Sequence, residues 1–210
     1  MNETRAETHP RSFLLILSGI LLLRVFFAYT LPIMDETEAR YAEIARKMVE
    51  TGEWITPQYD YGVPFWGKPP LSTWLSAIGI ELMGPAELGP RLPILLLSIV
   101  LAFLFWRFVR GALDNATAHI AAVILATSAI FFASAAAVMT DMVLLFCQFL
   151  MMSAFWRFMQ DGRRRDAWWM FAGLGLGLLT KGLMIGVTGV LPIAVWLTWQ
   201  KRWPRFLRQT

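Results

Sequence analysis

The feature that most constrains the fold of this chain is a series of long apolar stretches separated by short charged segments. Hydrophobic residues make up 57% of the 210 residues, whereas charged residues make up only 16%. A helix needs about twenty mostly apolar residues to cross a membrane, and a soluble domain carries more charge than this chain does. We therefore predict an all-α, polytopic membrane protein with about six transmembrane helices. The expected spans are residues 13–33, 92–108, 117–139, 142–159, 168–180 and 183–199.

The distribution of Lys and Arg orients these spans, because cytoplasmic loops of membrane proteins are enriched in both residues. If the N-terminus is cytoplasmic, 12 of the 19 basic residues lie on the inside, including the run at 163–165. Ten of the 15 acidic residues then lie on the outside. The ends of the first, third and fifth spans are therefore expected to face the exterior. We interpret the run at 163–165 as a topology signal that contacts membrane lipids, and we expect no nucleic acid partner.

The first exterior loop, residues 34–91, is predicted to contain two helices that lie at the membrane surface. Residues 36–50 place Ile44 and Met48 on an apolar face and Lys47 on a charged face, which is typical of an interfacial amphipathic helix. A capping box, Asp35-Glu36-Thr37-Glu38, is expected to begin this helix, and Thr51-Gly52 to end it. Residues 71–83 are apolar but too short to cross, so we expect them to be re-entrant or interfacial and to end at Gly84-Pro85.

The candidate site residues all fall on the outer side in this topology, and they are Asp35, Glu36, Lys68, Asp141 and Lys181. Each of the main candidates also has a purely structural interpretation. Asp35 and Asp141 could serve as helix N-caps, and the cap role of Asp35 is compatible with a functional one. Lys68 could reach the lipid headgroups while Pro69-Pro70 starts a helix. Lys181-Gly182, the expected hinge between the last two spans, is also a common helix C-terminal pattern.

Four residues inside the predicted spans constrain the packing or the chemistry. Arg24 lies near the middle of the first span, where a charge is costly unless it is paired or hydrated. No acid lies at a similar depth, so a carbonyl, water or a further helix remains as its partner. Gly173 and Gly177 have the spacing of close helix packing and lack the preceding strand of a dinucleotide loop. The single cysteine, Cys147, lies within a span, which rules out a disulfide framework or a Cys metal site.

Four blocks of the chain carry a resemblance to a known family. They are MDETEARYAEIARKMVETGEWITPQYDYGVPFWGKPPLSTWL, ELGPRLP, MTDMVLLF and GLLTKGLMIGVTGVLP. In this order and spacing, residues 11–205 resemble the N-terminal half of the polyprenyl-phosphate-dependent glycosyltransferases of the GT-C class. Within that class they are similar to the family of the lipid A aminoarabinose transferase and relatives of the protein O-mannosyltransferases. The resemblance implies that residues 1–210 form a single GT-C-like transmembrane catalytic module, as the N-terminal portion of such an enzyme.

The resemblance implies a membrane glycosyltransferase that takes a hexosyl or pentosyl group from a polyprenyl-phosphate donor. The acceptor would be a lipid, glycan or protein on the periplasmic or exterior face of a bacterial plasma (inner) membrane, as in cell-envelope glycan or lipopolysaccharide modification. The family pattern places its catalytic carboxylates at Asp35 and Asp141. It places the contact with the donor phosphate at Lys68, with Arg40 and Lys181 as further phosphate-binding candidates. Glu36 is a supporting candidate beside Asp35.

The expected chemistry agrees with these residue types. Displacement at an anomeric carbon develops positive charge on the sugar and negative charge on the leaving phosphate, and a carboxylate and a cation stabilise this separation where water is scarce. If the acceptor is a hydroxyl, Asp35 could take its proton; if the acceptor is a phosphate, Asp35 would position groups. The aminoarabinose transferases have a metal-binding Glu before the lysine, whereas this chain has Gly67. The segment 35–40 is also two residues longer than theirs. The sequence leaves the cofactor open, with a divalent metal as the one alternative that the resemblance implies.

A membrane transporter or lipid flippase is the alternative from another functional class. Such proteins place polar groups near the middle of the bilayer, often on broken helices within internal repeats. Here the charged residues gather at one face, and the sequence contains no such repeat. A cavity at the outer face lined by Asp35 and Lys68 would favour the transferase, whereas a cavity at the membrane midplane would favour transport.

Overall fold

The computed structural model describes residues 10–209 and is built almost entirely of helices. One short antiparallel hairpin, β1–β2, pairs Gln58 with Pro64 and Asp60 with Val63. In chain order the elements are α1 (Pro10–Thr30), α2 (Glu36–Thr51), β1 (Gln58–Asp60), β2 (Val63–Pro64), α3 (Leu71–Met83), α4 (Leu88–Ala112), α5 (Asn115–Thr127), α6 (Ala129–Ser134), α7 (Thr140–Asp161), α8 (Arg164–Lys181), the π-helix η1 (Gly186–Val190), α9 (Leu191–Trp199) and α10 (Trp203–Gln209).

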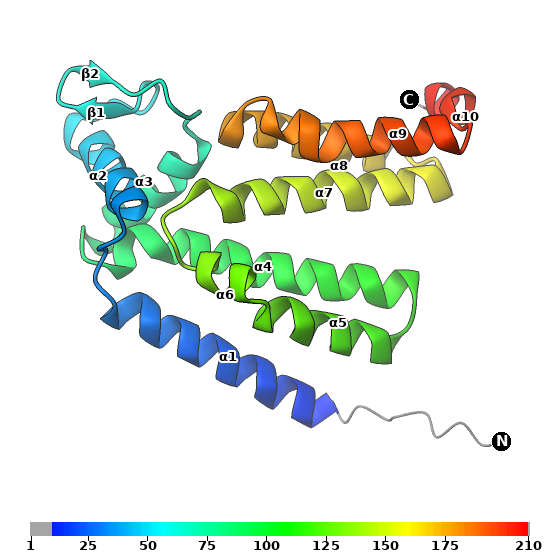
Figure 1. The fold of residues 1–210 in the computed structure, drawn as a ribbon, viewed down its shortest axis with the longest axis horizontal. Coiled ribbons are helices and arrows are strands. Elements are labelled where there is room, and N and C mark those ends of the chain that lie inside the picture. The colour runs from blue at the N-terminus through cyan, green and yellow to red at the C-terminus, as the bar shows by residue number, and fades with distance from the viewer. Residues whose placement is uncertain (1–9, 210) are drawn as a thin grey trace.

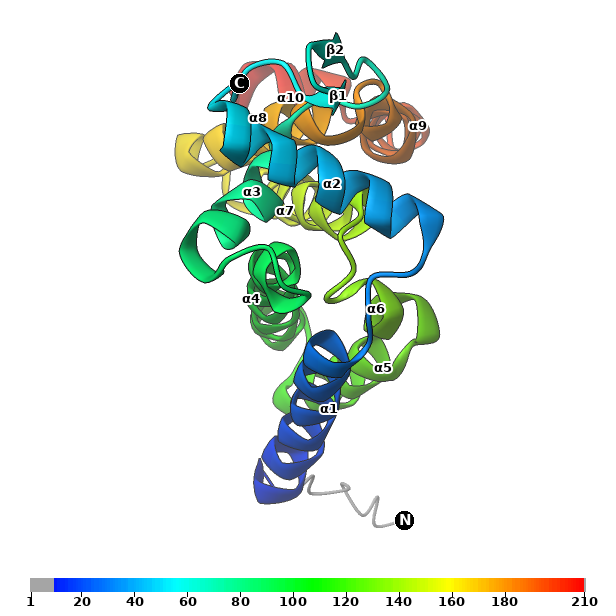
Figure 2. The same ribbon diagram turned by 90° about the vertical axis from the view of Figure 1, so that its left-hand side faces the viewer.

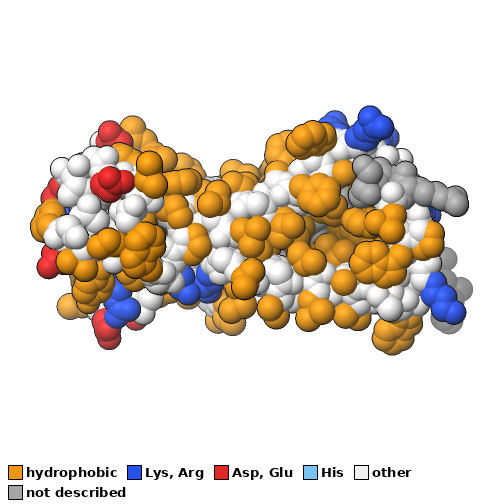
Figure 3. Space-filling model, turned by 90° about the horizontal axis from the view of Figure 1, so that it is seen from above, with side chains coloured by type: hydrophobic (Ala, Val, Ile, Leu, Met, Phe, Trp, Pro, Cys, Tyr) orange, Lys and Arg blue, Asp and Glu red, His pale blue; other side chains and the backbone are white. Residues whose placement is uncertain are grey.

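The long helices run side by side along the longest axis of the molecule (Figure 1). α2, α3 and the β-hairpin gather at one end of this bundle, and α2 lies across that end (Figures 1 and 2). The C-terminus and the start of α1 lie at the other end. On the face drawn in Figure 3, the acidic side chains lie at the end that carries the hairpin, and hydrophobic side chains cover much of the length between the ends. This arrangement agrees with the predicted division into an exterior and a cytoplasmic end.

Length and composition mark two of the described helices, α4 and α7, as able to cross a membrane. Four other apolar helical segments are shorter than 18 residues, namely Leu15–Thr30, Leu71–Met83, Asn115–Thr127 and Gly186–Trp199. Each of the first, second, fourth and fifth predicted spans corresponds to one helix, and the ends differ by a few residues. The last predicted span begins after Gly182, whose φ of 58° lies in the region that favours glycine, and it contains the π-helix and α9. The predicted hinge at Lys181-Gly182 is confirmed.

The prediction of one continuous span over residues 117–139 is wrong, because α5 ends at Thr127 and α6 covers only one and a half turns. The Thr127 and Ser128 hydroxyls donate to carbonyls of the preceding turn, at 2.7 Å from Val123 O and 2.9 Å from Leu125 O. Such local bonds compete with regular helix geometry. Ser128 itself has extended backbone angles. Residues 135–139, between α6 and α7, therefore lie outside these helices, and their backbone groups can bond to other segments.

Arg24 reaches a carbonyl, which was one of the three partners left open by the sequence. Its guanidinium donates to Ala133 O at 2.8 Å and lies 5.7 Å from the ring centre of Phe132. The acceptor belongs to α6, whose short length leaves carbonyls near its end without helical partners. The break in the third span thus supplies the hydrogen-bond acceptor for the charge in the first.

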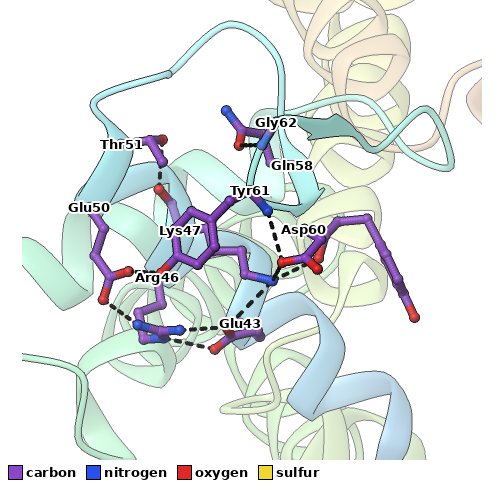
Figure 4. Close-up of polar contacts among 10 residues, drawn as sticks. Glu43, Arg46, Lys47, Glu50, Thr51, Gln58, Asp60, Tyr61 and Gly62 are labelled. Carbon is purple, nitrogen blue, oxygen red and sulfur yellow. Dashed lines mark hydrogen bonds and ion pairs between the residues drawn. The ribbon is translucent and has the colours of Figure 1, made fainter.

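The β-hairpin is held against α2 by a cluster of charged side chains (Figure 4). We expected Lys47 on the solvated face of α2, and this is wrong: the side chain is buried and donates to Tyr59 O at 2.9 Å and to Asp60 Oδ1 at 3.2 Å. The Tyr61 N–H and then the Lys47 ammonium lower the pKa of Asp60. A carboxylate with a lowered pKa stabilises the fold above its unfolded pKa and loses that contribution only when the pH falls through the folded value. The contact of Lys47 with Asp60 is therefore present at neutral pH and is lost as the pH falls through the lowered pKa of Asp60.

α8 packs closely on α7 through glycine, as the spacing of Gly173 and Gly177 predicts. A Cβ on Gly173 would lie 2.7 Å from Met151 N and 2.8 Å from Cys147 O, both backbone atoms of α7. A Cβ on Gly177 would lie 2.6 Å from the side chain of Ile185. Backbone atoms cannot move aside as a side chain can, so Gly173 sets the distance between the two helices.

We predict that Gly173→Ala destabilises the protein by about 1–3 kcal/mol, the usual cost of forcing extra volume into a packed interior. Thermal unfolding in detergent measures this change. Gly175→Ala is the matched control on the same helix, because a Cβ at Gly175 meets nothing within 4 Å. Equal unfolding temperatures for the two variants would contradict the close approach of α7 and α8.

Candidate functional site

The structure places the main candidate residues at the same end of the bundle, as the charge distribution predicts (Figure 1). Asp35 immediately precedes α2, and Lys68 lies three residues before the start of α3. Asp141 lies in the first turn of α7, and Lys181 is the last residue of α8. Because α7 and α8 run in opposite directions, the start of one and the end of the other meet at this end. Four segments distant in sequence therefore converge on one surface.

Asp35 is the N-cap of α2, so its structural interpretation is confirmed. Its Oδ1 accepts hydrogen bonds from Thr37 N and Glu38 N, both at 3.0 Å. The residue is exposed, and these two bonds use only one oxygen of the carboxylate. A capping carboxylate at a helix N-terminus is held in one orientation by these bonds. The second oxygen is thus fixed in space and faces solvent, which is compatible with a further role.

Asp141 and Lys181 form an ion pair, with 2.7 Å between Lys181 Nζ and Asp141 Oδ1. The Asp141 side chain is 56% exposed and that of Lys181 is 19% exposed. An ion pair with this exposure contributes little to stability, since solvent screens it. The pair instead fixes where a positive and a negative charge sit between α7 and α8. Asp141 is not the N-cap of α7, because that position is Met139, whereas Lys181 does lie in the last turn of α8 before Gly182, as the C-terminal pattern predicts.

The other candidates differ in how their charges are balanced. Arg40 pairs with Glu36 one turn earlier on α2, at the exposed start of that helix. Lys68 is half-buried and has no side-chain hydrogen bond or ion pair within residues 10–209. No hydrogen bond joins Asp35 to Lys68 in this part of the chain. The ammonium of Lys68 therefore remains available to an anionic ligand.

The sequence did not reveal the pairing of Glu38 with Arg91, which is buried beneath the candidate site. The predicted capping box is only half correct, because Glu38 does not reach back to the start of α2. Its carboxylate receives two hydrogen bonds from Arg91, from Nε to Oε1 and from Nη2 to Oε2, both at 2.8 Å. Both residues are buried. An arginine flanked by prolines in ELGPRLP, at the edge of a long apolar run, was the one signal of a buried partner.

Neither of two cavities found within residues 10–209 is the expected cavity lined by Asp35 and Lys68. A small one of about 10 Å³ lies between α2, α3 and the start of α7, close to the candidate residues. Its lining residues are Tyr41, Ser72, Thr73, Ser76, Val138 and Met139. The larger one, of about 530 Å³, lies between α1, α4 and α5. It reaches the depth of Arg24, near the middle of the first span, where a transport cavity was expected, but its walls are apolar apart from Arg24, Ser98 and His119, unlike a polar cargo site.

The residues present do not fit the metal site known from the aminoarabinose transferases. The ligand position is occupied by Gly67, which has no side-chain donor. Among the described residues, no group of three or more His, Cys, Asp or Glu side chains is arranged to hold a metal ion. A hard divalent cation needs several oxygen ligands. The described residues therefore supply too few ligands for such a site.

Comparison with known proteins identifies similar chains. A family described as dolichyl-phosphate-mannose-protein mannosyltransferase matches residues 12–210. An undecaprenyl phosphate-alpha-4-amino-4-deoxy-L-arabinose arabinosyl transferase of Erwinia tasmaniensis is 27% identical over 199 residues, which cover 89% of this chain and 36% of the relative. A protein of the same name from Pseudomonas aeruginosa is 31% identical over 203 residues, which cover 93% and 36%. The chain thus spans 36% of the length of these two relatives.

Two solved structures of ArnT from Cupriavidus metallidurans share the fold. The apo structure has a TM-score of 0.79 and 23% identity, covering 95% of this chain and 38% of that one. The structure bound to undecaprenyl phosphate has a TM-score of 0.79 and 24% identity, covering 96% and 38%. The predicted GT-C resemblance is therefore confirmed, and the chain has the fold of a polytopic membrane protein. It belongs to the dolichyl-phosphate-mannose-protein mannosyltransferase family.

Proposed function

We propose that this chain carries the donor-binding and catalytic end of a membrane glycosyltransferase that uses a polyprenyl-phosphate sugar. The observation that carries the proposal is the convergence of Asp35, Lys68 and the Asp141–Lys181 pair at one end of an apolar bundle. A lipid phosphate lies at a membrane surface with its hydrocarbon chain among the helices. The named activity of the relatives, transfer from an undecaprenyl phosphate sugar, supports this donor class. The transporter or flippase alternative gains no support from these relatives.

We propose separate roles for the charges. Lys68, whose ammonium has no bonded partner within residues 10–209, contacts the donor phosphate and stabilises its charge as the sugar leaves. Asp35, held by its cap bonds, orients the acceptor, and it takes the proton if the acceptor is a hydroxyl. Asp141 acts as a second carboxylate at the sugar, with Lys181 paired to it. Arg40, one turn into α2, and Lys181 add positive charge for the donor phosphate, and Glu36, the first residue of α2, supports Asp35.

The acceptor in this proposal is a lipid, glycan or protein at the same membrane face. We further propose that residues 1–210 act as one transmembrane module, with residues 34–91 as its exterior loop. The bundle end with α2 and α3 would face the periplasm of a bacterial inner membrane, and both the start of α1 and the C-terminal helix would face the cytoplasm. The excess of basic residues at the latter end supports this orientation.

Labelling of single cysteines tests the orientation. In a protein whose Cys147 is replaced by serine, a cysteine at position 60 should react with an impermeant reagent added outside intact cells. Cysteines at positions 114 and 163 should react only after the membrane is opened, because both lie at the basic end of the bundle. Reaction at position 163 from outside would contradict the proposed location of the site.

The role of Asp35 is tested by Asp35→Asn in the full-length protein. Asparagine keeps an oxygen that can accept the two cap bonds, so we expect unfolding free energy to change by less than the ~1 kcal/mol typical of cap loss. Sugar transfer from a radiolabelled polyprenyl-phosphate sugar should fall by roughly a hundredfold or more, as when one charge-stabilising group is removed.

Asp114→Asn is the matched control for this variant. Asp114 caps α5 at the opposite end of the bundle, where its side chain accepts from Thr117 N at 3.0 Å. This substitution should leave transfer unchanged. If well-folded Asp35→Asn protein transfers sugar at the rate of the control, then Asp35 is only a helix cap.

The role of Lys68 is tested by titrating the purified protein with a polyprenyl phosphate. Lys68→Ala should weaken binding by about 1.5–3 kcal/mol, the range for hydrogen bonds to charged groups. Lys68→Arg should recover part of the loss, because arginine restores the charge with a different shape. Lys201→Ala, at the other end of the bundle, is the control and should bind normally. Equal affinity of wild type and Lys68→Ala would remove Lys68 from the site.

A further inference from the structure

The buried pair of Glu38 and Arg91 connects four separate segments of the chain. Arg91 lies near the start of α4, and its Nη1 donates to Ala28 O at 3.1 Å and to Leu31 O. These carbonyls lie at the end of α1, where helical partners run out. On the other side, Glu38 Oε1 accepts from Val138 N at 3.0 Å, in the segment that leads into α7. The pair therefore joins the end of α1 and the starts of α2, α4 and α7.

This set of contacts forms a short path between the candidate acids. Asp35 accepts from the backbone N–H of Glu38, and the carboxylate of Glu38 accepts from the backbone N–H of Val138. Asp141 follows Val138 by three residues and is paired with Lys181. Each step is a hydrogen bond or one turn of chain. The position of Asp35 relative to Asp141 and Lys181 thus depends directly on the buried pair.

The buried pair of Glu38 and Arg91 contributes more to the positions of the segments that it joins than to the stability of the fold. Replacing such a pair by well-packed apolar residues is often neutral or stabilising, because burial of the charges is costly. Its benefit lies in geometry: a bidentate arginine–carboxylate contact fixes distance and angle together. Here the guanidinium also binds two carbonyls, so all three of its nitrogens are directed by the protein. A lysine would keep the charge but could not reproduce this fork.

We infer that Glu38 and Arg91 are positioning residues, which hold Asp35 at a fixed distance from the Asp141–Lys181 pair. The inference rests on the proposed transferase function for its catalytic consequence, whereas its geometric content does not depend on that function. Neither residue contacts substrate in this proposal, because both are buried beneath the site. Displacement of a reacting group by about 1 Å can lower a rate by about a hundredfold. Loosening the pair should therefore lower turnover while leaving donor binding at Lys68 intact.

The distance is measured directly with two spin labels in the full-length protein. Met34 and Leu183 are suitable positions, since both are 83% exposed and they neighbour Asp35 and Lys181. With Cys147 replaced by serine and the Glu38–Arg91 pair intact, pulsed electron–electron double resonance should give one narrow distribution of distances between the two labels. Arg91→Lys should broaden or shift this distribution, and Glu38→Gln, which keeps an oxygen acceptor, should have a smaller effect.

Turnover and binding are measured on the same variants without labels. In Arg91→Lys, kcat should fall by about 10- to 100-fold, while the Kd for a polyprenyl phosphate changes by less than about twofold, as for a group that acts only in the transition state. Arg157→Lys is the matched control. It makes the same substitution beside another buried carboxylate, Asp166, at the opposite end of the bundle, where Nε to Oδ1 is 3.1 Å. It should change neither the distance nor kcat.

The outcomes separate this inference from the proposed function. An unchanged distance distribution in folded Arg91→Lys and Glu38→Gln would overturn the inference, even if the wild type transfers sugar. A broadened distribution with normal kcat would also overturn the positioning role in catalysis. Absence of transfer by the wild type would refute the proposed function, and the distance measurement would still decide whether the pair sets the geometry. If Arg91→Lys does not fold, Glu38→Gln decides the question alone.

Discussion

The buried contact between Glu38 and Arg91 is the interaction on which the arrangement of the outer end depends. Carbonyls at the end of α1 have no helical partners, and an apolar bundle offers no water to satisfy them. Arg91 satisfies two of them and needs a counter-charge, which Glu38 supplies. Glu38 then has acceptor capacity left for Val138 N, at the entrance to α7. The hydrogen bonds of Arg91 and of its counter-charge Glu38 thus hold the four segments together at this point.

Around this contact, the molecule separates apolar and charged groups along its length. On the face drawn in Figure 3, apolar side chains cover much of the middle of the bundle, and acidic side chains lie at the end that carries the hairpin. The outer end adds α2 and the hairpin, held together by the buried Lys47 (Figure 4). A surface of this kind can bind a ligand with a charged head and a long hydrocarbon chain. The chemistry proposed for Lys68 and Asp35 requires that combination.

Several features of the site could be predicted because they depend on local sequence. The cap role of Asp35 follows from the residues after it, since a short acidic side chain meets the free N–H groups of the next turn. The hinge at Gly182 follows from a glycine after the last cation of a helix. The pairing of Lys181 with Asp141 could not be predicted in this way, because it depends on how α7 and α8 align. The partner predicted for Glu38 was wrong for the same reason. Its carboxylate was expected to bond to the start of α2, but it accepts from Arg91, which is distant in the sequence.

The sequence by itself determined the membrane-spanning helical class, the separation of charge between the two ends and the set of charged residues at the outer end. These properties depend on composition and on the period of apolar residues, which any fold of the chain must respect. Only the tertiary structure decided that the third span is broken, that Arg24 reaches Ala133 O and that Lys47 and Glu38 are buried. A side chain that carries both a charge and a long apolar stem can lie on either side of an interface. The choice is made by the partners that packing brings within hydrogen-bond distance, and these lie far away in the sequence.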